Sequence, residues 1–306
     1  MEGTGQGAGQ GTEDRAGDGT RPGARHRAPD ADGRARTVVL TRQPAQAGAL
    51  EAGLRAAGHE VRFLPLTDFE LPEDPAPLRE AVRRLAAGGY AWLVVTSPNT
   101  VRALVRAGWD GRLPAGVRVA VTGPGTARVL ASAGGPAAPW MPDGDASAAG
   151  IIAAFPAPDL AGTGRPGRRV LLPQSALAPD EVAAALDARG WAVERIEAYR
   201  TVPYPAAPAR RLLADGGHPV GLEEGPDGAV GLGALDGAAV VLTSPSAVRE
   251  LVRRLGGRPV GDAAFIAIGR PTQRAAASCG LALAGTAASP DAPGVLAVLA
   301  GLPATH

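Results

Sequence analysis

A Ser-Pro turn occurs twice in the chain, each time directly after an apolar segment. In TSPNTV the turn is Ser97-Pro98 after Thr96, and in TSPSAV it is Ser244-Pro245. A serine in this position caps a helix and the proline takes its first turn, so free N–H groups and the positive end of the helix dipole favour an anion. Ser97 and Ser244 are therefore candidate anion-binding residues, although a Ser-Pro pair is also an ordinary way for an α/β unit to begin a helix.

Two glycine-containing turns supply a second pair of helix starts. They lie at Gly123–Thr126, in VTGPGTAR, and at Gly269–Thr272, in IGRPTQR. Glycine lets the backbone approach a ligand closely, and the free N–H groups again favour an anion. A nucleotide phosphate loop would need more glycines and a lysine, and RQPAQAG after the first apolar run lacks the GxGxxG pattern. The turns therefore disfavour a nucleotide-dependent transferase.

Several catalytic residue types are missing or isolated. Lysine is absent, which excludes a Walker A lysine, a Schiff-base lysine and a lysine general base. The four histidines are far apart and lack HxH or HExxH spacing, which disfavours a histidine metal centre or a Ser-His triad. Cys279 is the single cysteine, and we expect it to pack. Arg42, after the first apolar run, is a candidate for pairing with a carboxylate, or else a solvated surface residue.

The composition narrows the class of protein. The 306 residues suffice for one large or two ordinary domains, and 45% are hydrophobic although only 4% are aromatic. The net charge of +1 gives no general attraction to nucleic acid or to an anionic membrane. No run of 18 apolar residues and no apolar N-terminal region occur, so we expect neither a membrane span nor a secretory signal, and we expect a cytoplasmic location.

Short apolar runs alternate with amphipathic segments. The runs have the length and β-branched content of strands, and the segments carry apolar residues at i, i+3 and i+4, as helices do. This alternation predicts an α/β fold whose parallel sheets are covered on both faces. The predicted strands are Thr37–Leu40, Val61–Leu66, Trp92–Thr96, Val117–Val121, Val170–Leu172, Ala239–Thr243 and Phe265–Ile268, and the helices include Ala76–Ala87, Glu181–Arg189 and Ala247–Leu255.

The chain also repeats itself. Tyr90–Val105 (YAWLVVTSPNTVRALV) matches Gly237–Val252 (GAAVVLTSPSAVRELV), and AVTGPGTARVLASAG from Ala120 matches AIGRPTQRAAASCG from Ala267. A fainter pairing joins VVLTRQ near the start to VLLPQS in the middle, each followed by a helix and then by GHEV or GWAV. The repeats predict two lobes of related architecture, with a ligand site in the cleft between them.

Two segments carry few aliphatic side chains. Residues 1–36 consist mainly of Gly, Arg, Asp, Ala and Pro and cannot bury enough surface to offset the entropy of ordering, so we expect a disordered tail. A second stretch, Ala214 to Leu235, is rich in Gly, Asp and Glu and indicates a surface loop.

Taken in order, these motifs resemble those of uroporphyrinogen-III synthases. The resemblance rests on VVLTR at Val38–Arg42, the proline turn at Phe63–Leu66, TSPNTV, VTGPGTA, LLPQSALAPDEV, IEAYRTV at Ile196–Val202, TSPSAV, AIGRPTQRAAASCGL and ASPDAPGV. Each motif is loose by itself, but the ordered set extends over residues 37–302.

The resemblance implies a discontinuous arrangement of the two lobes. Each lobe would be a parallel sheet flanked by helices, with the N-terminal βαβ segment packed in the C-terminal lobe. Two strands, near Leu64–Phe69 and Ile196–Val202, would cross between the lobes. Lobe one would then comprise residues 37–66 plus 200–302 and lobe two residues 67–199, with hinge motion around the cleft.

The resemblance also implies an enzyme of tetrapyrrole biosynthesis, a lyase. Such an enzyme closes the linear tetrapyrrole hydroxymethylbilane, inverts ring D and yields uroporphyrinogen III. The substrate carries eight carboxylates and a hydroxymethyl leaving group on ring A, and the enzyme's main task is to hold the chain in one curl. No cofactor and no metal would be needed, and a monomer without nucleic-acid or membrane partners is implied.

The site residues follow from the same resemblance. Tyr199 in EAYRTV matches the family's tyrosine at the cleft, where a phenol protonates the departing hydroxyl; local packing is the alternative role. Thr126 and Thr272 match threonines that hold substrate carboxylates or cap helices. With Arg42, Ser97 and Ser244 they are the candidate substrate-binding residues. A non-catalytic, two-lobed binding or regulatory protein would use the same cleft without turnover.

Overall fold

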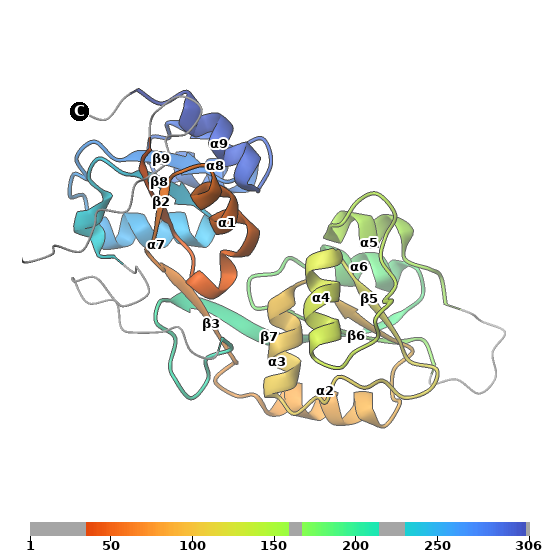
Figure 1. Cartoon of the computed structure of the whole chain (residues 1–306). Helices are drawn as coiled ribbons and strands as arrows, with labels where there is room; N and C mark the ends of the chain where they lie inside the picture. The colour runs from red at the N-terminus through yellow and green to blue at the C-terminus, as the bar shows by residue number, and fades with distance from the viewer. Residues whose placement is uncertain (1–34, 159–166, 214–229, 304–306) are drawn as a thin grey trace, which may run out of the picture.

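The computed structural model describes residues 35–158, 167–213 and 230–303, and it has two lobes joined by a pair of strands (Figure 1). One sheet has the strand order β10-β9-β8-β1-β2, and we call its lobe lobe one. The other has the order β3-β7-β6-β4-β5, and we call its lobe lobe two. All strand pairs are parallel except β3 with β7. The predicted α/β fold with two similar lobes is confirmed.

The elements of each lobe have the following bounds. Lobe one contains strands β1 (Thr37–Leu40), β2 (Glu60–Phe63), β8 (Ala239–Leu242), β9 (Ala264–Ala267) and β10 (Gly285–Thr286), helices α1 (Gly48–Ala56), α7 (Pro245–Leu255), α8 (Arg270–Ser278) and α9 (Ala292–Ala300), and 3₁₀ turns at Pro44–Gln46 and Leu232–Leu235. Lobe two contains strands β3 (Thr67–Glu70), β4 (Trp92–Val95), β5 (Arg118–Val121), β6 (Arg169–Ser175) and β7 (Ala192–Pro203), and helices α2 (Ala76–Ala86), α3 (Pro98–Arg106), α4 (Pro124–Ser132), α5 (Ala148–Ala154) and α6 (Glu181–Ala188).

Helices cover both faces of each sheet because successive strand residues point to opposite sides. In lobe one, Val38 packs in a cluster with α1 and α9, whereas Val39 packs with α7 and α8. In lobe two, Leu93 packs with α2, α3 and α4, whereas Val94 packs with α5 and α6. The strands are therefore apolar on both sides, which explains why they are continuous apolar runs in the sequence.

The internal repeat extends through both lobes. The order β9-β8-β1-β2 in lobe one corresponds to β5-β4-β6-β7 in lobe two, so the faint pairing of VVLTRQ with VLLPQS places equivalent strands, β1 and β6, at equivalent positions. The helices that follow them, α1 and α6, are each succeeded by a glycine with left-handed backbone, Gly58 at φ 85° and Gly190 at φ 89°. The two lobes are thus two copies of one unit.

A further pair of helices, α5 and α9, matches across the lobes without having been identified in the repeat. Ser147 caps α5 and Asp291 caps α9, and each side chain accepts the N–H of the residue three positions on, Gly150 or Gly294. A Cβ on Gly150 would lie 1.9 Å from a backbone oxygen, and one on Gly294 would lie 2.2 Å from another. Glycine is needed in both lobes because the turn before the helix folds against it.

The N-terminal β1-α1-β2 unit lies in lobe one, although the rest of that sheet comes from the C-terminal part of the chain. Strand β1 is central, since Leu40 pairs with Phe63 of β2 and with Val241 of β8. The unit that ends lobe two, β6-α6-β7, therefore corresponds to the unit that begins lobe one. Lobe one is a permuted copy of lobe two, as the resemblance implied.

Two strands cross between the lobes. Strand β3 pairs with the end of β7 in antiparallel register, from Thr67 opposite Pro203 to Glu70 opposite Arg200. The sequence pattern did not indicate the full length of β7, because most of its side chains are only half-buried and form no apolar run. Strand β2 ends at Phe63 instead of at Leu66 as predicted, because a proline follows at position 65 and has no N–H for the ladder.

A buried ion pair anchors this connection. Asp68 of β3 is fully buried, and its Oδ2 lies 2.7 Å from Arg211 Nε and accepts the Ala206 N–H at 3.0 Å. Its Oδ1 accepts from Gln43 Nε2 at 2.8 Å and from the Phe69 N–H. Arg211 Nη2 also donates to Gln43 Oε1 at 3.2 Å. One carboxylate therefore joins β3, the segment after β7 and the loop after β1.

The two segments predicted to be irregular overlap only partly with the described residues. Residues 1–34 and 214–229 lie outside them. Arg36, assigned to the tail, is instead buried, and its Nη2 donates to the backbone oxygens of Leu302 and Pro303. Val230 and Leu235, assigned to the surface loop, are buried in the core of lobe one. These ends of the two predicted segments were wrong because a few aliphatic or long side chains suffice to anchor a segment locally.

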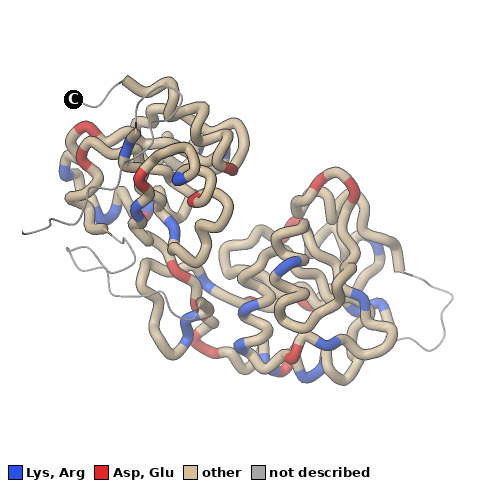
Figure 2. The backbone as a smooth tube through the Cα atoms, viewed as in Figure 1, with Lys and Arg blue, Asp and Glu red and all other residues tan. Residues whose placement is uncertain are grey.

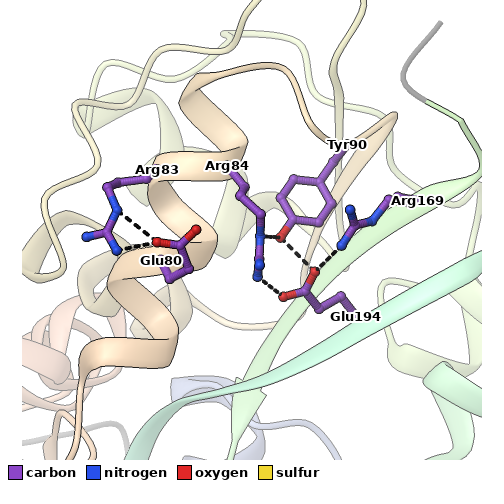
Figure 3. A network of polar contacts seen from close by, with 6 residues as sticks. All are labelled: Glu80, Arg83, Arg84, Tyr90, Arg169 and Glu194. Carbon is purple, nitrogen blue, oxygen red and sulfur yellow. Dashed lines mark hydrogen bonds and ion pairs between the residues drawn. The ribbon is translucent and has the colours of Figure 1, made fainter.

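A polar network closes the opposite end of lobe two (Figure 3). Glu194 of β7 pairs with Arg84 of α2 and, at 2.9 Å, with Arg169 at the start of β6. It also accepts from the phenol of the buried Tyr90 at 2.9 Å. Because Tyr90 and Arg169 stand at the amino ends of β4 and β6, this network is structural and lies away from the carboxyl edge of the sheet.

Replacing Glu194 by glutamine is expected to lower the free energy of unfolding by about 1–3 kcal/mol, because three contacts with a charged acceptor are weakened together. Urea unfolding followed by tryptophan fluorescence measures this directly, since the four tryptophans of the chain all lie in lobe two. Glu80→Gln is the matched control, because the Glu80–Arg83 pair in Figure 3 is exposed and is expected to contribute less than about 1 kcal/mol. Equal effects of the two changes would contradict the prediction.

Candidate functional site

The carboxyl edges of both sheets carry the predicted helix starts. Ser97 caps α3 and its side chain accepts the Thr100 N–H at 3.2 Å, and Ser244 caps α7 and accepts the Ala247 N–H at 3.1 Å. Gly123 and Gly269 stand at the same positions before α4 and α8. Each lobe therefore presents two helix N-termini at the edge where α/β proteins bind ligands.

A cavity of about 450 Å³ lies between the lobes. Lobe one contributes the loop after β1 and the start of α7, whereas lobe two contributes β3, the first turns of α3 and part of α4. The lining residues are Thr41, Arg42, Ala45, Gln46, Thr243 and Ser244 from lobe one, and Thr67, Phe69, Pro98, Asn99, Arg102, Arg128 and Val129 from lobe two. The site is thus shared by both copies of the repeat.

A second cavity, of about 770 Å³, lies within lobe one at the carboxyl ends of β8, β9 and β10. It shares Thr243 and Ser244 with the cavity between the lobes, so the two adjoin. Thr272, Gly269 and Arg270 at the start of α8 also line it. The hydroxyl-bearing turns of lobe one therefore face a larger space than the cavity between the lobes alone.

The lining of both cavities is basic. Among the described residues that line them there are four arginines and no aspartate or glutamate. Figure 2, viewed as in Figure 1, marks basic residues on α3 and α4, and neither helix contains an acidic residue. Burial lowers the pKa of Arg42 and of Arg102, because the charged guanidinium is the form that loses hydration. The site therefore suits a ligand with several negative charges.

Tyr199 lies on β7, behind the wall of the cavity between the lobes. Its phenol is 3.0 Å from Ser97 Oγ, and its ring packs edge-on against Phe69 with the centroids 5.9 Å apart. Burial raises the pKa of Tyr199, and hydrogen bonds with Ser97 and Ser175 act in the opposite direction. The phenol is thus kept in its protonated, proton-donating form at neutral pH.

The structure brings most of the predicted site residues together in two groups. Arg42 and Ser244 line the cavity between the lobes, and Ser244 and Thr272 line the cavity of lobe one. Ser97 and Tyr199 contact each other behind the wall of the cavity between the lobes. Thr126 is buried in the first turn of α4 and lines neither cavity, and no side chain caps this helix.

Sequence reasoning did not select Asn99, Arg102 and Arg128. Arg102 follows Ser97 by five positions, and Arg128 follows Thr126 by two. Arginines stand at the equivalent repeat positions of lobe one, Arg249 and Arg274, yet neither of them lines one of the two cavities. The local sequence does not distinguish Arg102 and Arg128 from Arg249 and Arg274. The packing of one lobe against the other decides which of these two pairs lines the cavity between the lobes.

Other kinds of site are not formed by the part of the chain that the structure describes. No three His, Cys, Asp or Glu side chains there gather as a metal site requires. No helix in the described ranges is long and apolar enough to cross a membrane. Cys279 is half-buried and packs beside the core of lobe one.

Solved structures share this two-lobed fold. The chain aligns over 88% of its length with a mutant uroporphyrinogen III synthase from the extremely thermophilic bacterium Thermus thermophilus, covering 100% of that chain, at a TM-score of 0.50 and 22% identity. It aligns to the same extent with the uroporphyrinogen-III synthetase of Helicobacter pylori, at a TM-score of 0.52 and 14% identity. At these identities the likeness concerns the fold.

Sequence relatives agree. The uroporphyrinogen-III synthase of Synechococcus elongatus is 30% identical in an alignment 188 residues long, which covers 58% of this chain and 66% of the relative. The chloroplastic uroporphyrinogen-III synthase of Oryza sativa subsp. japonica is 32% identical in an alignment 170 residues long, which covers 54% of this chain and 53% of the relative. The alignments thus cover less than two thirds of each relative. The family model described as uroporphyrinogen-III synthase HemD matches residues 48–297. That match extends over most of the chain and over both lobes, and the chain therefore belongs to the uroporphyrinogen-III synthase family.

Proposed function

We propose that the protein is an enzyme, a lyase, that converts hydroxymethylbilane into uroporphyrinogen III with inversion of ring D. The observation that carries the proposal is the basic cavity between two lobes, built at helix N-termini and lined by arginines without a carboxylate. A linear tetrapyrrole with eight carboxylates supplies the negative charges that such a lining favours. Closure of two lobes around it would hold the flexible chain in one curl.

In the proposed reaction the C–O bond of the hydroxymethyl group on ring A breaks. Tyr199 donates a proton to the departing hydroxyl, which leaves as water, and an azafulvenium cation remains. Ring D attacks through its substituted α-carbon to give a spiro intermediate, which fragments and recloses with ring D inverted and loses a proton. Burial raises the pKa of Tyr199, so the phenol is protonated at neutral pH and has a proton to donate. Because the phenol lies behind Phe69 and Ser97, this role requires movement of the cavity wall.

Substrate contacts are assigned to the residues that line the two cavities. Arg42 would bind a carboxylate through its N–H groups, and Ser244 and Thr272 would do so beside the first N–H groups of α7 and α8. For Ser97 the contact with Tyr199 favours a second role, which is to orient the phenol. Thr126 lines neither cavity, and its contact with substrate stays a prediction. The cytoplasmic location, the monomeric state, the lobe boundaries and the lack of a nucleic-acid partner stay predictions.

Incubation of the purified protein with freshly made hydroxymethylbilane tests the proposal. The products are oxidised, and uroporphyrin isomers I and III are separated by chromatography. We expect isomer III to predominate, because spontaneous closure gives the uninverted isomer I. Isomer I alone, formed at the rate seen without protein, from a chain shown to be folded by circular dichroism, would contradict the enzyme and favour a two-lobed binding protein.

A further inference from the structure

We propose that Arg102 and Arg128 of lobe two, facing Arg42 of lobe one, form a carboxylate-binding cluster that determines affinity for the acidic substrate. The inference rests on the proposed function for the identity of the ligand, and it assigns two residues that neither the motifs nor the helix caps had indicated. All three side chains line the same cavity, and they come from three separate elements: α3, α4 and the loop after β1.

The first argument is that no carboxylate of the described residues neutralises any of these three arginines. Arg102 Nη1 donates to Asn99 Oδ1 at 2.7 Å, and Arg42 Nη1 donates to the Gln46 backbone oxygen at 3.3 Å. Arg128 has no ion pair with any described residue. Such contacts orient a guanidinium without neutralising its charge, so each cation remains available to an anion.

The second argument is the contrast with three other partly buried arginines of the described residues. Arg211 pairs with Asp68, Arg84 pairs with Glu194 and Arg254 pairs with Glu250. Arg42 and Arg102 are also half-buried, yet no carboxylate of the described chain accompanies them. A partly desolvated charge without a counterion is unfavourable, and an anionic ligand would relieve that cost on binding. We therefore interpret the cluster as a binding site for an anion and not as part of a structural ion pair.

The third argument comes from the internal repeat. Arg249 and Arg274 occupy the repeat positions of Arg102 and Arg128, but neither of them lines one of the two cavities. Lobe two therefore adds a pair of guanidinium groups to the cavity between the lobes, and the equivalent positions of lobe one do not. A ligand whose ends differ chemically would bind in one orientation.

Arg102→Gln and Arg128→Gln, singly and together, test the cluster. Each removes a charge-assisted contact, so we expect KM for hydroxymethylbilane to rise roughly 10-fold or more for each single variant and further for the double variant. The kcat should change less than KM, because the proposed contacts are with carboxylate side chains and not with the atoms that react. Arg→Lys at either position should restore part of the affinity, since the charge returns without the planar fork.

Matched controls are Arg249→Gln and Arg274→Gln, which make the same change at the equivalent positions of lobe one. Their KM should equal that of the wild type. Uroporphyrin, an octacarboxylate without the leaving group, serves as the binding probe through its quenching of tryptophan fluorescence. Raised salt should weaken the binding of uroporphyrin to the wild type more than to the double variant, because the double variant has fewer charged contacts that salt can screen.

The outcomes separate this inference from the proposed function. Isomer III from the wild type, with KM unchanged in the Arg102 and Arg128 variants or raised equally in the lobe-one controls, would overturn the cluster and leave the enzyme in place. Isomer I alone from the wild type, with uroporphyrin binding that still depends on Arg102 and Arg128, would overturn the enzyme and leave the cluster in place. Folding of every variant is checked by its circular dichroism spectrum and urea midpoint.

Discussion

Replacing Tyr199 by phenylalanine is expected to slow formation of isomer III by roughly 100-fold, because the reaction would lose its positioned proton donor. The ring and its edge-on contact with Phe69 are retained, so packing changes little. Residual activity is expected, since the cavity still holds the substrate in its curl. As the enzymatic rate falls toward that of spontaneous closure, the fraction of isomer I should rise.

The rate is measured at low temperature beside Tyr90→Phe, the matched control. Tyr90 is also buried, and its phenol donates a hydrogen bond to Glu194 at the far end of lobe two. Its replacement should lower stability and leave the rate unchanged.

The pH profile of the rate gives a second readout. Because burial raises the pKa of Tyr199, the phenol stays protonated through neutral pH, and a fall in rate from its ionisation is expected only above about pH 10. A Tyr199→Phe variant with the wild-type rate would exclude the acid role.

Asp68→Asn is expected to lower the free energy of unfolding by about 3–5 kcal/mol, because it leaves the largely buried Arg211 without its counterion. Arg211 is 13% exposed and cannot regain full hydration. The asparagine also replaces one of the two acceptor oxygens by an N–H₂ group, which cannot accept a hydrogen bond. In one orientation of the amide this group faces Arg211 and the Ala206 N–H, and in the other it faces the Gln43 side-chain N–H₂, so donors lose their acceptor in either case. The expected loss of stability is large because the Asp68 carboxylate joins three separate segments of the chain.

Urea unfolding measured by tryptophan fluorescence and by circular dichroism tests this expectation. Glu73→Gln is the control, since the Glu73–Arg200 pair is long, at 3.7 Å, and Glu73 is exposed. It should change stability by less than about 1 kcal/mol. The double variant Asp68→Asn with Arg211→Gln should recover part of the loss, because it removes the uncompensated charge. A single Asp68→Asn change that costs no more than Glu73→Gln would mean that the pair does not anchor the connection.

The features that the sequence predicts well are local ones. Ser97 and Ser244 cap helices as expected because a cap depends on the next three residues alone. The apolar strands were also recognisable, since burial on both faces gives an unbroken apolar run. Strand β7 was not delimited in this way, because its half-buried side chains form no such run. Its crossing, like the permuted position of β1, came from the family resemblance.

The site could be predicted only in part for the same reason. Arg42 and Ser244 follow strand ends directly, so the carboxyl edge of a sheet places them. Arg102 and Arg128 lie within helices and have exposed counterparts at the same repeat positions, so only the packing of the lobes distinguishes them. Arg36 was misassigned to a tail because its partners, Leu302 and Pro303, lie at the other end of the chain.

The permuted origin of lobe one has a consequence for the order in which the chain acquires structure during synthesis. The elements of lobe two, β3 to β7, are consecutive, so that lobe can form as soon as the ribosome has made β7 and before it has made β8 to β10. Strand β1 is made first, but its partner Val241 is about 200 residues away from Leu40. Until β8 emerges, the edge of β1 that will pair with β8 has backbone N–H and C=O groups without partners. The pairing that completes it joins residues that are far apart in the sequence, and such contacts form slowly. The N-terminal unit is therefore the segment that depends most on late, long-range pairing, and the nascent chain is most prone to aggregate there.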